Sequence, residues 1–357
     1  MYRRLILVAT FVFALALAAC AAPAAPAAAP ATEAPAAAEA PAAASESPAP
    51  AETSGPFRIA IVMPSSTTDL AWSQAMYDAL KSVQAEMGGE GSLEIAYSEN
   101  MFQVTDAAAA IRDYAAEGFH LVIAHGTQYG NSMFEVATDF PETSFAWGTA
   151  VDTGAEKGLK NVFAYEAAAD EGGYVNGVIA ALLSETNVIG VVGPVEAGDA
   201  KLYIDGFKKG VMDTKPDAVV NVSFTGSFGD TALAAEAANV HIQAGADVLT
   251  GSAQQVVGAV GVAKENGVKW LGTQSDQTSL GPDVVVANQV YAWTGVVKDM
   301  IVKIQAGELG GTAYNLTLAN GGLVIAYNSA VPVPDDVKAA ADAAIAGIED
   351  GSITTME

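Results

Sequence analysis

The chain has little of three things that proteins use for chemistry and cross-linking: cysteine, histidine and positive charge. Its 357 residues include one cysteine, three histidines and 16 lysines and arginines against 41 aspartates and glutamates, which gives a formal net charge of -25. A single cysteine excludes an internal disulfide. Because nucleic-acid polymers and anionic lipid surfaces are themselves negatively charged, both are poor partners for so acidic a chain.

The signatures of common catalytic sites are also missing. The three histidines (His120, His125 and His241) form no H-E-x-x-H pair, and there is no second cysteine to help hold zinc. Neither the G-x-S-x-G elbow of α/β hydrolases nor the G-x-x-x-x-G-K-[ST] loop of P-loop ATPases is present. The glycine cluster at residues 88–91 precedes an expected strand, the reverse of the order in a dinucleotide-binding loop. We therefore expect a protein that is not an enzyme and needs no cofactor or metal.

The N-terminal segment has the pattern of a lipoprotein leader. Arg3 and Arg4 precede the uncharged stretch 5–17, which leads through two alanines to Cys20. Thirteen residues are too few to span a bilayer as a helix. We expect residues 1–19 to be a signal peptide and Cys20 to carry a lipid that anchors the mature protein to the membrane. The alternative is an ordinary secretory signal in which the cysteine has no role.

Residues 20–56 consist mostly of alanine and proline, with four scattered glutamates. Such a segment lacks the apolar bulk to offset its chain entropy, and the recurring prolines oppose an alanine helix. We predict a lipidated Ala/Pro-rich tether that is disordered or partly polyproline II.

From residue 57 onward, short apolar runs alternate with longer amphipathic stretches, such as the helix predicted by Met76, Leu80, Val83 and Met87 at spacings of four, three and four. Near-continuous apolar runs are typical of parallel strands covered by helices on both faces. About 300 residues approach the size at which one core splits into two. The pattern therefore predicts a doubly wound α/β fold with two lobes. The expected strands are 57–63, 119–124, 188–192, 219–224, 247–250 and 268–273.

Several expected strands are followed by polar and aromatic residues, where open α/β sheets bind ligands. Residues 69–74 (DLAWSQ) resemble the D-x-x-[FW]-[NST]-x signature of the BMP family, the basic membrane lipoproteins typified by PnrA-type nucleoside-binding components of ABC transporters. The ordered set of matches makes the resemblance specific. The other matches are 171–177 (EGGYVNG) to E-A-x-Y-L-A-G, 224–230 (FTGSFGD) to G-S-F-x-D, 250–252 (TGS) to a small-residue loop, and 272–277 (GTQSDQ) to G-x-D-x-D-Q.

This resemblance implies a type I periplasmic-binding-protein fold, in which two doubly wound α/β lobes are joined by three hinge crossings and enclose the ligand. We place the crossings near residues 165–169, 287–291 and 323–328. The expected bounds are 57–166 and 290–328 for lobe I, and 167–289 and 329–357 for lobe II.

The resemblance also implies ligand-binding roles for eight residues. Trp72 and Phe228 would cover the two faces of a purine ring, and Asp276 would accept hydrogen bonds from the ribose or the base. The backbone of a small-residue loop would allow close approach, and three polar side chains would contact the edges of base or sugar. The loop residues are Gly251 and Ser252, and the polar side chains are Asp69, Gln74 and His125.

Each of these residues also has a plain structural interpretation. Trp72 is spaced as a core residue of its helix, and Phe228 fits the plug of a turn. Asp69 and Asp276 suit helix caps or turns, and His125 suits a polar residue that closes its strand.

One departure from the family bears on the ligand. Many nucleoside-binding members have Phe-Asn where this chain has Trp72-Ser73, and serine lacks the paired donor and acceptor of an amide. The Trp-Ser form resembles a branch that takes free purine bases or other small heterocycles. Lys298 lies near the family's Thr-Ser-x-x-Lys, but the residues around it differ.

Together these features predict an extracytoplasmic solute-binding lipoprotein of an ABC importer, held on the outer face of the cell membrane by lipid on Cys20. It would capture a purine nucleoside or nucleobase between two closing lobes and meet the transporter permease. We expect a monomer that binds no nucleic-acid polymer. The alternatives are a binder of a sugar or another small polar ligand with the same fold, and a receptor that presents its ligand to a sensor.

Overall fold

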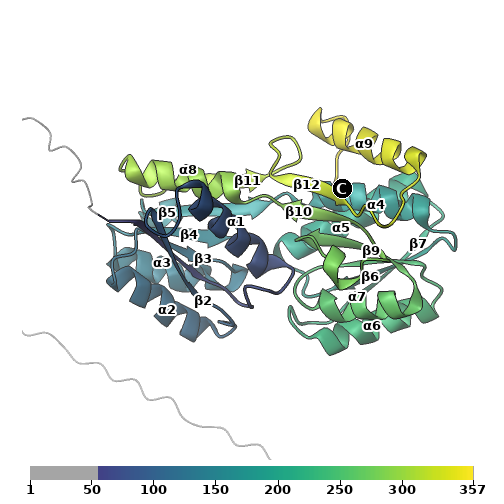
Figure 1. Ribbon diagram of the computed structural model, residues 1–357, viewed down its shortest axis with the longest axis horizontal. Coiled ribbons are helices and arrows are strands. Elements are labelled where there is room, and N and C mark those ends of the chain that lie inside the picture. Colours follow the sequence, from purple (N-terminus) through teal and green to yellow (C-terminus); the bar gives the residue numbers. More distant parts are fainter. Residues whose placement is uncertain (1–54, 357) are drawn as a thin grey trace, which may run out of the picture. The chain divides into compact units, whose positions relative to one another are not determined.

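The computed structural model describes residues 55–356 and contains two six-stranded sheets (Figure 1). The expected signal peptide, Cys20 and all but the last two residues of the expected tether lie outside the described residues. Within residues 55–356, no helix has both the length and the apolar character needed to cross a membrane.

The first sheet is parallel throughout, with strand order β11-β5-β4-β3-β1-β2. Its inner strands β1, β3, β4 and β5 are largely buried, which explains their near-continuous apolar sequences, whereas the edge strands β2 and β11 are partly exposed. We call this sheet, with α1, α2, α3 and α8, lobe I. The strands are β1 (Phe57–Val62), β2 (Leu93–Ser98), β3 (Leu121–Ala124), β4 (Ser144–Gly148), β5 (Val162–Ala167) and β11 (Ala313–Leu316), and the helices are α1 (Trp72–Glu86), α2 (Val104–Ala116), α3 (Gly130–Asp139) and α8 (Thr294–Gln305).

The second sheet has the order β12-β10-β9-β8-β6-β7 and is parallel except for the β10–β12 pair. We call it lobe II, together with α4, α5, α6, α7 and α9. The strands are β6 (Val188–Gly193), β7 (Val219–Phe224), β8 (Val248–Gly251), β9 (Lys269–Gln274), β10 (Val285–Tyr291) and β12 (Leu323–Tyr327), and the helices are α4 (Ala169–Leu183), α5 (Gly198–Thr214), α6 (Thr231–Gln243), α7 (Val256–Asn266) and α9 (Asp335–Glu349). The two α/β sheets confirm the predicted fold class.

The chain passes between the sheets after β5, after β10 and after β11. This differs in one segment from the expected bounds, because residues 323–327, expected in lobe I, form β12 and pair with β10 in the second sheet. Residues 290 and 291, also expected in lobe I, complete β10. The apolar pattern of β12 shows that it is a strand, but it cannot show which sheet edge the strand joins or in which direction.

Helices α4 and α5 cross with their backbones in close contact. A Cβ atom added at Gly177 would lie 2.2 Å from the carbonyl oxygen of Phe207, and one added at Gly210 would lie 2.1 Å from that of Tyr174. Glycine is therefore required at both positions. The crossing explains Gly173 and Gly177 of the 171–177 motif, whereas Gly172 lies against the side chain of Gln289 on β10. The crossing also fixes α5, whose first turn reaches the cavity described next.

Candidate functional site

A small cavity of about 40 Å³ lies between the two lobes. It is lined by loops that follow the carboxyl ends of parallel strands, where open α/β sheets bind ligands. Lobe I contributes Pro64, Trp72, Phe102, Gly126, Thr127, Gln128 and Thr149, and lobe II contributes Asp199, Ala200, Phe228, Ala253, Gln254 and Gln274.

Trp72 is the first residue of α1, and its indole ring is held in place from several sides. The ring stacks on His125 at a centroid distance of 4.1 Å and an interplanar angle of 3°. Its Nε1 donates to the carbonyl oxygen of His125 at 3.1 Å. Tyr291 and Trp293 meet it edge-on at 6.3 Å and 5.9 Å. With 5% of its surface exposed, Trp72 is both a core residue and part of the cavity wall.

His125 lies behind Trp72 and is not among the residues that line this cavity. Its Nε2 donates to the carbonyl oxygen of Trp72 at 2.9 Å, so its Nδ1 is left to accept from the hydroxyl of Tyr165 at 2.7 Å. Burial lowers the pKa of His125 to about 3, which keeps the ring neutral at physiological pH. The structure thus gives His125 a supporting role for the indole.

Asp69 and Gln74, two other expected ligand contacts, organise the start of α1 instead of lining the cavity. The Asp69 carboxylate accepts from the backbone N–H groups of Ala71, Ser73 and Gln74 at 2.9–3.1 Å. The Gln74 Oε1 accepts from the N–H of Leu70 at 2.9 Å. Burial raises the pKa of Asp69, and the backbone donors partly oppose that shift. The structure therefore supports the helix-cap interpretation for Asp69.

Three further expected contacts are also placed away from the cavity lining. Asp276 is exposed, accepts from the Thr278 N–H at 2.9 Å and from Asn288 Nδ2 at 3.0 Å, and lines a separate groove beside α1. A Cβ atom at Gly251 would lie 2.6 Å from the carbonyl oxygen of Val192, so strand packing alone requires glycine there. Ser252 is buried, and its hydroxyl has no hydrogen-bond partner.

Of the eight expected residues, the structure brings Trp72 and Phe228 to one cavity from opposite lobes. Sequence reasoning missed Asp199, Gln254 and Gln274. The signal for Asp199 was present, because an acidic residue opens the helix that follows β6.

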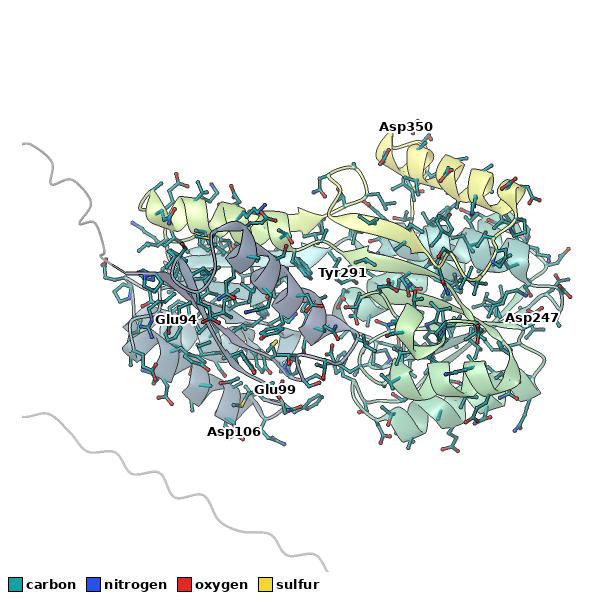
Figure 2. The ribbon with its side chains drawn as sticks, in the orientation of Figure 1. Glu94, Glu99, Asp106, Asp247, Tyr291 and Asp350 are labelled. Atoms are coloured by element: carbon teal, nitrogen blue, oxygen red, sulfur yellow. The ribbon has the colours of Figure 1, made fainter. Side chains whose placement is uncertain are left out.

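Asp199 lies in the first turn of α5 and is 8% exposed. Its Oδ2 accepts from Gln274 Nε2 at 3.1 Å and from the Tyr291 hydroxyl at 3.0 Å. Burial raises the pKa of Asp199, and hydrogen bonds from Gln274, Tyr291 and nearby backbone N–H groups oppose the shift. Tyr291 ends β10 between the two lobes, as Figure 2 shows.

Strained backbone and unpartnered polar atoms gather at this cavity. Thr149, Ala253 and Gln274 line the cavity with backbone φ angles of 62°, 69° and 73°. These angles lie in the left-handed region, which residues other than glycine rarely adopt. The Oε1 atoms of Gln254 and Gln274 are buried without a hydrogen-bond partner. Strain and unmet hydrogen bonds of this kind are typical of binding sites.

Direct hydrogen bonds join the lobes beside the cavity. Ser275 Oγ, just after β9, donates to the carbonyl oxygen of Ala71 at 2.8 Å. Gln277 Nε2 donates to the carbonyl oxygen of Leu70 at 3.4 Å. The two lobes are therefore in direct contact beside the cavity.

Comparison with known proteins agrees with this geometry. The chain is 28% identical over 285 residues to a purine-binding protein of Brucella abortus, covering 80% of this chain and 79% of that protein. It is 27% identical to the ABC transporter nucleoside-binding protein BmpA of Lactococcus lactis, covering 83% and 88%. An ABC transporter solute-binding protein from Conexibacter woesei superposes with a TM-score of 0.70 at 25% identity, covering 84% of this chain and all of that one.

The family model for PnrA-like ABC transporter substrate-binding proteins matches residues 57–351, which is nearly all of the described part of the chain. The chain therefore belongs to the Bmp family of ABC transporter substrate-binding proteins.

Proposed function

We propose that this substrate-binding protein captures a purine nucleoside or nucleobase between its lobes and delivers it to the permease of an ABC importer. The observation that carries the proposal is the fixed indole of Trp72 facing a cavity that Phe228 lines from the other lobe. Two aromatic groups from opposite sides suit a flat ring, and stacking on one contributes about 1–3 kcal/mol. The names of two relatives, purine-binding and nucleoside-binding, support the same ligand class.

Binding and recognition by the permease would be coupled through lobe closure. Trp72 and Phe228 belong to different lobes, so a ligand contacts both only when the lobes approach. A ligand that binds the closed form more tightly shifts the population toward it. We propose that a permease partner distinguishes loaded from empty protein by that shape, with the protein acting as a monomer.

The test is calorimetric titration of the chain with Cys20 replaced by serine, after refolding free of ligand. The titrants are adenine, adenosine, guanosine, inosine, ribose and glucose. Micromolar or tighter binding of any purine supports the proposal, and a nucleoside preference adds ribose to the recognised group. Binding of a sugar with no response to any purine contradicts the proposed ligand class.

The proposed anchor makes a separate prediction. Cys20 lies outside the described residues, and the proposal rests on the Leu-Ala-Ala-Cys pattern alone. We expect Cys20→Ser to abolish lipid attachment and release a folded protein from the membrane fraction, measured by fractionation and by the mass of the intact chain. A variant that stays with the membrane contradicts the anchor.

A further inference from the structure

One wall of the cavity consists of hydrogen-bond acceptors whose orientation is fixed. Gln274 is 2% exposed, and its Nε2 donates to Asp199 Oδ2 at 3.1 Å. Because a carboxylate only accepts, the amide nitrogen must be the end that faces Asp199. Oε1 of Gln274 is then the free end, and it is buried without a partner among the described residues.

Asp199 itself has no cationic partner. No ion pair to a lysine or arginine involves it within residues 55–356, and the nearby Lys201 pairs with Asp205. Its hydrogen bonds come from Gln274, the Tyr291 hydroxyl and backbone N–H groups of the first turn of α5. A carboxylate buried in this way gains from additional donors, which a ligand in the cavity can supply.

The residue type at position 274 determines the charge beside Asp199. Position 274 carries an amide, not a carboxylate. An aspartate there would set a second carboxylate beside Asp199, and like charges in a buried site repel. The amide instead binds Asp199, and its Oε1 remains a neutral acceptor without a partner on a residue that lines the cavity.

We propose that an exocyclic amine of the ligand bridges Asp199 and Gln274 Oε1, so that the cleft selects aminopurines over oxopurines. An amine offers two hydrogens at once, one for each of two neighbouring acceptors, whereas a ring N–H offers one. A ligand carbonyl in the same place would face two oxygens and leave both without a donor. This inference rests on the proposed purine ligand and names the specificity-determining residue, Asp199, and the residue that positions the second acceptor, Gln274.

The experiment compares three ligands that differ at C6 and at the neighbouring N1: adenine with an amine, hypoxanthine with a carbonyl and an N1–H, and purine with neither. We expect the wild-type protein to bind adenine about 10- to 100-fold more tightly than hypoxanthine or purine, as two hydrogen bonds including one to a charged acceptor predict. Asp199→Asn should reduce adenine affinity at least tenfold and purine affinity less than threefold. Gln274→Leu should also reduce the preference for adenine.

Asp205→Asn is the matched control, because it lies on the same helix and pairs with Lys201 at the surface. It should leave the order of the three affinities unchanged. Equal binding of adenine and hypoxanthine by the wild type overturns the inference, as does an equal loss for all three ligands in Asp199→Asn. Either of these results would still allow the protein to bind a purine. If no purine binds at all, both this inference and the proposed purine ligand are contradicted.

Discussion

Trp72 has two roles, and a test of its contact with ligand must separate them. Trp72→Ala removes a stacking surface but also a buried side chain, which costs about 3–5 kcal/mol of stability when an aromatic is truncated in a core. Trp72→Phe keeps a ring. We expect Trp72→Ala to weaken purine binding at least tenfold and Trp72→Phe to weaken it by less, measured by calorimetry on protein shown to be folded by circular dichroism.

The matched control is Tyr97→Ala, which removes an exposed aromatic on β2 away from the cavity. The Tyr97→Ala protein should bind the purine with the same affinity as the wild type. Unchanged affinity in a folded Trp72→Ala protein would assign the indole to the core alone.

Single residues also show where sequence reasoning ends. Trp72 and Phe228 were expected at the cleft from the family resemblance, and both line the cavity. The G-x-D-x-D-Q match pointed to Asp276, but residues 274 and 276 are separated by the end of β9, and Gln274 is the one that lines the cavity. The positive φ of Gln274 turns the backbone at the end of β9, and this turn could not be predicted from the sequence pattern.

Asp199 predicts a pH dependence of stability. Burial raises its pKa in the folded protein above the ordinary value of 3.8. The folded state then holds the proton more tightly than the unfolded chain, so the free energy of unfolding falls as pH rises from 3.8 to the folded pKa and stays lower above it. Asp199→Asn removes this cost. Without ligand, the variant should unfold a few degrees above wild type at pH 7.

The difference should vanish near pH 3, where the carboxyl is protonated in both states. Besides burial, the charge of Asp199 raises the pKa of Glu166 and of Tyr291, so Asp199→Asn relieves the repulsion between residues 199 and 166 at pH 7 as well. A lower unfolding temperature for Asp199→Asn at pH 7 would mean that the hydrogen bonds of the carboxylate outweigh its desolvation. If Asp199 binds the ligand, Asp199→Asn should lower the affinity for ligand and raise the unfolding temperature. A purely structural role for Asp199 does not predict this combination.

At the scale of elements, the α4–α5 crossing is a tightly constrained contact in lobe II. Gly177→Ala puts a Cβ 2.2 Å from a backbone oxygen of α5, so the helices must separate. We expect a loss of at least 1–3 kcal/mol in the free energy of unfolding. Gly261→Ala on α7 is the control, because nothing lies within 4 Å of the added Cβ, and it should gain about 0.5–1 kcal/mol.

Urea denaturation measures both changes. A Gly177→Ala protein as stable as the wild type would show that the crossing tolerates separation, and the position of Asp199 at the cavity would then need another support. The repeated G-x-x-x-G spacing in both helices carried this information in the sequence, but only the structure shows that the two helices face each other.

Half of the strands were predicted from the sequence. Parallel strands buried on both faces produce apolar runs that stand out from helices, and all six expected runs became strands (β1, β3, β6, β7, β8 and β9), whereas β2, β4, β5, β10, β11 and β12 were not predicted. Residues 323–327 were expected as a crossing at the end of lobe I, but they form β12 beside β10 in the second sheet, because an edge strand with partly exposed residues is compatible with either sheet. Which edge a returning strand joins depends on the packing of the whole lobe.

At the scale of the whole molecule, the side chains of Ser275 and Gln277 donate hydrogen bonds across the lobes beside the cavity, in addition to apolar packing shared by both lobes. Ser275→Ala removes the 2.8 Å hydrogen bond to the carbonyl oxygen of Ala71, and one such bond contributes about 0.5–1.5 kcal/mol. Neither group touches the cavity, so the ligand contacts stay the same. We expect purine affinity to fall about two- to tenfold.

Ser275→Ala should lower the fraction of ligand-free protein that is closed and should leave the geometry of the ligand-bound protein unchanged. Small-angle scattering should then show a larger radius of gyration for ligand-free Ser275→Ala than for wild type, with equal values at saturating ligand. Ser98→Ala, which breaks a bond to Tyr114 inside lobe I, should change neither quantity. Equal affinity and equal scattering of Ser275→Ala and wild type would mean that the ligand and the aromatic contacts close the lobes unaided.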